Sequence, residues 1–331
     1  MTSKTRNFVV ASTMVLGAGL GTGLLAYYVG FPSGAASRRG PEDLQFIPAT
    51  ATLVASADVH TIMTSPLRER LRALVPTPHG QADFAAQTGI NIDTDLDRIT
   101  AAMTPSVGSA RGLEALMVAR GRFDVVKIEA LMREHGCRVE EVSGKRLLIA
   151  EGVEGKHPVS LAFMAPGLIV FGSASQVRAA LALSQGGANV TSLDEVMSLV
   201  RDLDSSTAWA VGRFDALTAS AALPPVVSDN LPPVQWFSAN IFVDGGVRGT
   251  IRVETRDDAS ANSLRDIVRG GLALARLQSS RYPLARAALD ALTLEGDGRQ
   301  VSLSFDVPVE LFDELTTTMS QGARRNTPTI Q

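Results

Sequence analysis

The sequence has 331 residues, of which 45% are hydrophobic and 20% are charged, with a mean hydropathy of +0.13. That composition excludes an intrinsically disordered chain, and the length allows about two domains, each large enough to bury a core. The first 40 residues contain four basic and no acidic side chains, so residues 41–331 carry 27 basic against 34 acidic ones. An acidic body lacks the positive surface that nucleic-acid binding requires, so no nucleic acid is expected as a partner.

An apolar segment at Phe8–Phe31 is the first predicted element. No charged side chain lies between Asn7 and Ser37. As a helix, its 24 residues at 1.5 Å each span about 36 Å, which crosses a bilayer core of about 30 Å with some tilt. Lys4 and Arg6 precede the segment, which favours an amino end inside the cell and a body outside the cytoplasm. The sequence therefore predicts a single-pass anchor in the inner (cytoplasmic) membrane, with the lipid bilayer as the partner of Phe8–Phe31.

Residues 1–40 also have a second interpretation, a cleaved secretory signal followed by a linker. The segment 33–35 (SGA) supplies the small residues of a cleavage site, although the apolar stretch is longer than the about 7–15 residues of a signal peptide. Both interpretations place the body outside the cytoplasm, either anchored or secreted. The sequence contains one cysteine, so no intramolecular disulfide forms and the fold depends on its core.

Gly17, Gly19, Gly21 and Gly23 form two small-xxx-small pairs inside the apolar segment. Such pairs allow two helices to approach closely in a membrane, so these glycines are the candidate contact residues of a homodimer. The competing interpretation is that small residues are simply common in membrane helices. The same region fits a GxGxxA pattern, but a dinucleotide site is disfavoured because that fingerprint needs an acidic residue on a second strand, whereas Glu42 follows a turn-rich linker.

Residues 41–186 are predicted to form a first α+β unit. Its strands are apolar or alternating, and its helices carry an apolar stripe at a spacing of three or four residues. Asp124, and Ser173 or Ser175, are placed to cap its two longer helices. The predicted elements are, in chain order, a strand at 51–59, helices at 65–74 and 81–88, strands at 99–104 and 113–120, a helix at 124–135, strands at 138–142, 146–150, 159–165 and 168–171, and a helix ending at 183.

Residues 187–321 are predicted to contain a linker and a second α+β unit, followed by a disordered tail at 322–331. The linker begins at 186 and has a possible helix at 193–200. Asp257 or Asp258 is placed to cap the longest helix of this unit, on which an apolar stripe includes Leu264 and Ile267. The predicted elements are, in chain order, a strand at 207–212, a helix at 214–222, strands at 234–243 and 247–254, the capped helix, strands at 291–294 and 301–307, and a closing helix at 309–319.

Both halves give the order strand, helix, strand, strand, helix, strand, strand, which indicates an internal duplication. Hairpin signals dominate the connections, so the sheets are expected to be mostly antiparallel with helices packed on one face. The predicted fold class is α+β: an N-terminal transmembrane helix followed by two similar sheet units. Segments 113–150 and 248–307 are expected to superpose. The stripes expected to pack on equivalent sheet faces are those of Ile128 and Leu131 and of Leu264 and Ile267.

Three segments resemble a family of uncharacterised bacterial membrane-anchored proteins that lie outside the cytoplasm. They are Ile47–Val59 (IPATATLVASADV), Val118–Asp124 (VARGRFD) and Val170–Ser173 (VFGS). The resemblance covers most of the body, and its motifs are structural rather than chemical. It implies an N-terminal anchor, an extracytoplasmic location and the architecture given above, and it implies no activity.

The four histidines and the one cysteine show no spacing typical of metal ligands. The segment 135–137 (HGC) stands where a helix is expected to end, and Gly136 is explained as its C-terminal cap. The segment 93–97 (DTDLD) begins like a calcium loop, but Arg98 and Thr104 replace the glycine and glutamate that such a loop requires. A turn with a capping aspartate is the preferred interpretation, so no metal site is assigned.

Asp58 and His60 would share a face if their strand continued, and a distant serine would complete a triad. No GxSxG elbow occurs in the sequence, so His60 is interpreted as a residue at a strand end. The sequence LPPV occurs at 223–226 and again at 231–234, near Trp236. These segments are interpreted either as an extended edge that binds a partner or as a stiff connection into a strand, and the second interpretation is preferred. No catalytic and no cofactor-binding residue is assigned.

The expected function is a non-enzymatic interaction or scaffolding role in the bacterial envelope, with an unidentified envelope protein as partner. The motivation is an anchor followed by a body without recognisable catalytic or cofactor motifs. The alternative is a ligand-binding or hydrolytic domain whose site is dispersed in sequence. A pocket with convergent polar groups between the two halves would favour the alternative, whereas a filled seam would favour scaffolding.

Overall fold

The computed structural model describes residues 41–72, 81–106, 112–150, 159–214, 232–279 and 283–310. The predicted anchor, linker and tail at 1–40 and 322–331 lie outside these residues, as do almost all of the predicted helices at 214–222 and 309–319. Within the described part of the chain, no helix is long and apolar enough to cross a membrane.

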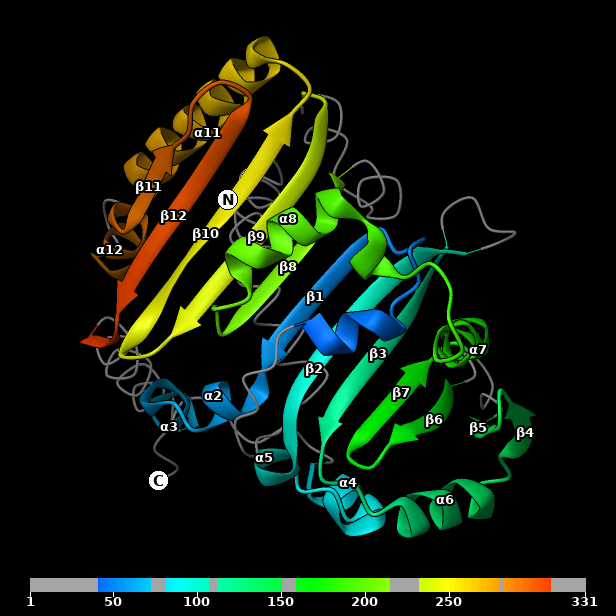
Figure 1. The fold of residues 1–331 in the computed structure, drawn as a ribbon. Helices are drawn as coiled ribbons and strands as arrows, with labels where there is room; N and C mark the ends of the chain where they lie inside the picture. The colour runs from blue at the N-terminus through cyan, green and yellow to red at the C-terminus, as the bar shows by residue number, and fades with distance from the viewer. Residues whose placement is uncertain are drawn as a thin grey trace, which may run out of the picture.

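Twelve strands form one continuous antiparallel sheet that runs across the whole molecule (Figure 1). Its strand order is β11-β12-β10-β9-β8-β1-β2-β3-β7-β6-β5-β4. The strands are β1 (Leu53–Asp58), β2 (Leu96–Pro105), β3 (Leu113–Gly121), β4 (Arg138–Val142), β5 (Lys145–Ala150), β6 (Val159–Ala165), β7 (Leu168–Gly172), β8 (Ala208–Arg213), β9 (Val234–Val243), β10 (Gly246–Thr255), β11 (Leu292–Glu295) and β12 (Gln300–Pro308).

The pairing of β1 with β8 joins the two halves of the chain into this sheet. In the register, Ala55 of β1 lies opposite Ala210 of β8, while β2 pairs with the other side of β1. The two predicted sheet units are therefore parts of one sheet, and the prediction of an α+β fold with antiparallel strands is confirmed. Both central strands are apolar, and the pairing removes the exposed edge that each would otherwise present.

Helices connect and cover the strands, and the predicted capping residues are confirmed. Asp124, Ser173 and Asp257 are the N-caps of α6, α7 and α11, where each side chain accepts a backbone N–H of the first turn. The helices are η1 (Pro41–Phe46, 3-10), α2 (Val59–Met63), α3 (Pro66–Arg72), α4 (Gln81–Thr88), α5 (Ile92–Asp95), α6 (Val125–Glu134), α7 (Ala174–Leu183), η2 (Val190–Ser192, 3-10), α8 (Asp194–Leu203), α11 (Asp258–Gln278) and α12 (Pro283–Asp290).

The front face of the sheet, defined as the face that carries Leu116 and Val118, holds the largest core, which continues from the first half onto Trp209 and Val211 of β8. Helix α7 and the 3-10 helix η1 pack over it on the first half, whereas α8 packs over β8 and β9 of the second half (Figure 1). Val177 and Leu181 of α7 and Val200 of α8 are each at most 1% exposed. The predicted linker between the halves therefore contains a helix, α8, that belongs to the core.

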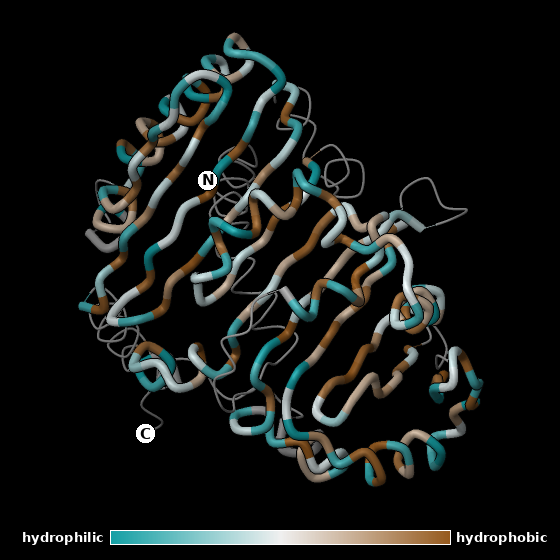
Figure 2. The backbone as a smooth tube through the Cα atoms, in the orientation of Figure 1, coloured by the Kyte–Doolittle hydropathy of each residue, from teal (hydrophilic) through white to brown (hydrophobic). Residues whose placement is uncertain are grey.

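The back face of the first half carries a second core. Val59 of α2, Ile90 of the loop after α4 and Ile128 of α6 pack there with Ile99 and Ile169 of the sheet. Helices thus cover both faces of this half, so the prediction of helices on one face is wrong here. The physical reason lies in β7, which is hydrophobic along most of its length (Figure 2). It supplies Leu168 and Val170 to the front core and Ile169 to the back core.

The second half is covered differently. Helix α11 packs on the back face, and the cluster it helps to bury contains four residues, Val234, Ala261, Leu264 and Val301. Strand β12 alternates hydrophobic and hydrophilic residues along its length (Figure 2). Its front face is consequently polar, and the hydroxyls of Thr250 and Ser304 hydrogen-bond across β10 and β12 at 3.1 Å.

Arg265 attaches α11 to the sheet. This buried side chain, 9% exposed, donates hydrogen bonds to the carbonyls of Gly298 and Gln300, each at 2.8 Å. Leu264 faces the sheet as predicted, but Ile267 is 46% exposed, so its predicted packing against the sheet is wrong. At 100° per residue, Ile267 lies on the flank of the helix, and Val268 occupies the inward position instead.

The halves share an order of connection when read outward from the β1–β8 pair. The first half gives β1-β2-β3-β7-β6 and the second gives β8-β9-β10-β12-β11. Strand β12 next to β10 thus corresponds to β7 next to β3. The predicted superposition of 113–150 on 248–307 is wrong, because it matched β12 with β5, which lies with β4 at the far edge of the sheet.

Candidate functional site

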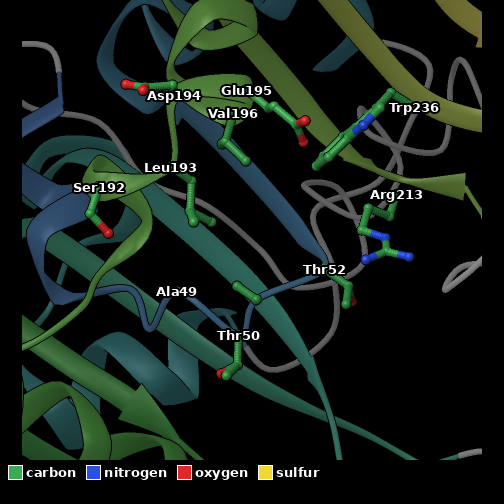
Figure 3. A pocket seen from close by; sticks show the side chains of 11 residues that line it. Ala49, Thr50, Thr52, Ser192, Leu193, Asp194, Glu195, Val196, Arg213 and Trp236 are labelled. Carbon is green, nitrogen blue, oxygen red and sulfur yellow. The ribbon is translucent and has the colours of Figure 1, made fainter.

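A pocket of about 450 Å³ opens on the front face where the two halves meet. Its walls come from the segment that enters β1, from the start of α8, and from the adjoining ends of β8 and β9 (Figure 3). The lining residues are Ala49, Thr50, Ala51, Thr52, Ser192, Leu193, Asp194, Glu195, Val196, Arg213 and Trp236.

Backbone hydrogen bonds hold the pocket walls in place. The carbonyl of Thr52 accepts the N–H of Arg213 at 2.8 Å, and the N–H of Thr52 donates to the carbonyl of Met103 at 2.8 Å. The N–H of Val190 donates to the carbonyl of Ile47 at 2.9 Å, which holds the chain before α8 against the same segment. The pairing that joins the two halves therefore also builds the pocket.

Three charged side chains and one indole ring line the pocket. Asp194 and Glu195 occupy the first turn of α8, where the helix dipole stabilises carboxylates. Glu195 extends toward Trp236, whereas Asp194 points away from the pocket (Figure 3). A carboxylate, the Arg213 guanidinium and an indole ring can orient a small polar ligand by hydrogen bonds and stacking.

Sequence reasoning missed this pocket. Its lining residues come from four short segments that are far apart in the chain, and no spacing pattern connects them. The acidic pair at the start of α8 was the one available signal. It was ambiguous, because two acidic residues in the first turn of a helix are also common as ordinary helix stabilisation. None of the lining residues is a histidine, cysteine or lysine.

Glu114 of β3 is the centre of a second polar cluster. Its carboxylate accepts hydrogen bonds from the hydroxyls of Ser106, Ser173 and Ser175 and from the side-chain amide of Gln176. These bonds, that of Ser175 foremost, lower the pKa of Glu114 below its ordinary value of 4.5 against the opposing effect of burial. Because three of the donors belong to the start of α7, the cluster docks this helix on β3.

Asp58 and His60 do not form a catalytic pair. Asp58 is the N-cap of α2, and its carboxylate accepts the N–H of Thr61 at 2.8 Å. His60 lies one residue inside that short helix rather than at the end of the strand. The strand ends because the Asp58 side chain supplies the hydrogen bond that begins a helix. Nearby, burial raises the pKa of Asp97 above its ordinary value.

The acidic segment 93–97 begins in a capped helical turn and ends in β2, and the predicted capping aspartate is wrong because the cap is an asparagine. Asn91 caps the short helix α5, and Asp95 accepts the N–H of Asn91 at 2.7 Å. Asp93 accepts a hydrogen bond from Arg68 at 2.9 Å. These carboxylates are therefore used to fix the loop between α4 and β2.

The segment 135–137 ends α6, as interpreted. His135 is the C-cap, and Gly136 has φ +76°, a left-handed conformation that favours glycine. Burial raises the pKa of the Cys137 thiol, which disfavours the nucleophilic thiolate. Across the described ranges, no group of three or more histidine, cysteine, aspartate or glutamate side chains is placed to hold a metal ion.

Helix α11 presents an exposed apolar stripe, formed by Ile267, Leu274 and Leu277. These side chains are 46%, 41% and 73% exposed, and they make up half of the large hydrophobic residues that are exposed in the described part of the chain. Gly270 and Gly271 lie between them with open space around their Cα atoms. The stripe is therefore a second candidate surface, distinct from the pocket. The glycines Gly17, Gly19, Gly21 and Gly23 and the LPPV segment at 223–226 lie outside the described residues.

Comparisons with known proteins assign no family. No protein-family model and no curated protein matches this chain. One solved structure, crystal form I of TP0453, is similar in fold with a TM-score of 0.44 and 10% sequence identity, over 85% of this chain and 99% of that one. A likeness of this size assigns neither a family nor a function.

Proposed function

We propose that this chain is a membrane-anchored extracytoplasmic protein with a non-enzymatic interaction or scaffolding role in the bacterial envelope. The observation that carries the interaction role is the stripe of Ile267, Leu274 and Leu277, because a contiguous set of exposed apolar side chains marks a contact surface. A single exposed residue would need no such explanation.

The sequence supports the anchor. Phe8–Phe31 is long enough to span the inner (cytoplasmic) membrane, and Lys4 and Arg6 before it favour a body outside the cytoplasm. Gly17, Gly19, Gly21 and Gly23 give this segment two small-xxx-small pairs, which support a homodimer of anchors in the bilayer. Secretion after cleavage near Ala35 is the competing location.

Fractionation and a reporter fusion test the location. A reporter that is active only outside the cytoplasm, fused after Gln331, should give signal while the protein stays in the membrane fraction. Signal from a cytoplasm-specific reporter alone would contradict the proposed topology. A released body whose first residue lies near Ala36 would replace the anchor by a cleaved signal.

Site-directed crosslinking tests the interaction role. A photoactivatable residue at position 277 should give crosslinks to an envelope component in intact membranes. The matched control is position 126 on α6, where Val126 is 80% exposed but stands apart from the stripe. Equal crosslinking at both positions would show that exposure alone, and not the stripe, determines contact.

The pocket supports a second candidate function, the binding of a small polar ligand. The observation that favours it is that Glu195 extends toward Trp236 at the junction of the halves, with Arg213 lining the same pocket. A small-molecule screen by thermal shift tests it. A genuine ligand should stabilise the native chain and the Asp194→Asn variant, whose side chain points away, but not Glu195→Gln. Equal stabilisation of all three would place the ligand elsewhere.

A further inference from the structure

We infer that the C-terminal half of α11 lies on an anionic lipid surface. This inference deepens the proposed function and rests on it for the nearness of a membrane. It names the partner of the exposed stripe as a bilayer that carries negatively charged headgroups, and it assigns Leu277 to the part of the helix that enters the interface.

The apolar side chains of α11 form two stripes with different partners. Leu264 and Val268 face the sheet, whereas Leu274 and Leu277 are exposed and lie, respectively, about a third and about half of a turn around the axis from Val268. Leu277 is the most exposed of these side chains, at 73%. Exposed apolar side chains on the outer side of a surface helix are what an interfacial helix inserts below the headgroups.

The charge of this region is opposite to that of the body. The 20 residues from 267 to 286 contain four arginines and no acidic residue, although residues 41–331 carry 27 basic against 34 acidic side chains. Arg269 and Arg286 are 65% and 67% exposed at their side chains. Their ion pairs with Asp266 and Asp290 are solvent-exposed and therefore weak, so the guanidinium groups can turn to lipid phosphates.

A second copy of this chain fits the stripe less well. Two copies that met along α11 would bring their arginine-rich segments together, which disfavours the contact. A stable interface also buries about 1,200 Å² or more, which exceeds what three partly exposed side chains supply. An anionic lipid surface instead attracts the arginines and requires no closed interface of fixed area.

The proposed anchor keeps the body close to the bilayer. Residues 32–40 connect Phe31 to the first described helix, and nine extended residues reach at most about 30 Å. Pro41, where the described fold begins, is therefore tethered within about one bilayer thickness of the membrane surface. Such a tether strengthens a weak interfacial contact elsewhere on the body, because it replaces a separate binding event by an intramolecular one.

A fluorescent probe on the full chain tests this contact. The chain carries Cys137→Ser, which removes its one cysteine, and a new cysteine at Leu277→Cys or, as the matched control, at Val126→Cys. Each is labelled with an environment-sensitive dye. The protein is reconstituted into phosphatidylcholine vesicles with and without phosphatidylglycerol, and quenching by nitroxide-labelled lipids is measured.

The expected result is a blue shift and strong lipid quenching at position 277 in vesicles with phosphatidylglycerol, which decrease at high salt, with neither effect at position 126. A water-like spectrum at 277 in vesicles that retain the protein would overturn the inference and leave the anchor intact. A shift in lipid-free detergent that grows with protein concentration would also overturn it and assign the stripe to a second copy. Release of the protein from the vesicles by alkali, together with a blue shift of the probe at position 277 at neutral pH, would contradict the anchor and support the lipid contact.

Discussion

The two halves of the sheet differ in how their faces are covered, although their strands are connected in the same order. The first half has a core on each face, one under α7 and one under α2 and α6. In the second half, α8 extends the front core only over β8 and β9, the back face buries one cluster of four residues under α11, and the front of β10 and β12 is polar. The same topology thus gives one half in which helices cover both faces of the sheet, and another half in which α11 exposes an apolar stripe.

Most of the deeply buried core and the proposed contact surface thus lie in different halves of the sheet. Regions with few buried apolar contacts open at lower free energy than the core, and contact surfaces are commonly drawn from them. The pairing of β1 with β8 makes the division possible, because the second half is held by the first and does not need a full core of its own. Four predictions test this division.

The largest effect is expected in the front core of the first half. Leu116→Ala removes a side chain that is 0% exposed and leaves a cavity under α7, so it should lower the free energy of unfolding by about 2–5 kcal/mol. Denaturant titration measures this value. A loss below that of Leu264→Ala, in the small cluster of the second half, would reverse the ranking of the two cores.

A smaller effect is expected where α11 is attached. Arg265→Met removes the donors of two carbonyls, those of Gly298 and Gln300, and should cost about 1.5–3 kcal/mol. The cost should appear as faster hydrogen exchange in α11 and β12, with β3 and β7 unchanged. Faster exchange throughout the sheet would show that the halves do not open separately.

The polar anchor of α7 gives a pH-dependent effect. Hydrogen bonds hold the folded pKa of Glu114 below its ordinary value of 4.5, so the carboxylate stabilises the fold above that pH and loses this contribution as the pH falls through the lowered pKa. Glu114→Gln should therefore cost about 1 kcal/mol at neutral pH, and the difference from the native chain should shrink in acid. A difference that stays constant from neutral to acidic pH would rule out the carboxylate as its source.

The smallest effect on stability is expected on the stripe itself. Leu277→Ser changes a side chain that is 73% exposed, so the free energy of unfolding should change by no more than about 0.5 kcal/mol. Lipid quenching of a probe on the neighbouring turn should nevertheless decrease. A stability loss comparable to that of Leu116→Ala would mean that Leu277 packs within the fold.

The local elements could be predicted from the sequence because their signals are local. Capping aspartates and serines began α6, α7 and α11, and turn residues such as those at 143–144 and 166–167 separated the strands of hairpins. The end of α4 at Gly89, which has φ +74°, was equally readable.

The joining of the two halves could not be predicted in the same way. Nothing local to β1 or β8 says that Ala55 will lie opposite Ala210, because strand pairing between distant segments depends on the whole fold. The pocket follows from that pairing and was missed with it. The covering of the first half by helices on both faces did have a signal, the uninterrupted apolar run in β7, which contrasts with the alternation in β12.

Native-state hydrogen exchange compares the two halves most directly. Amides of β2, β3 and β7 are expected to exchange only through global unfolding, whereas those of α11 and β11 are expected to exchange through an opening of lower free energy. Equal protection of α11 and β3, with both lost in one global transition, would contradict the division between a stable half and a contact half.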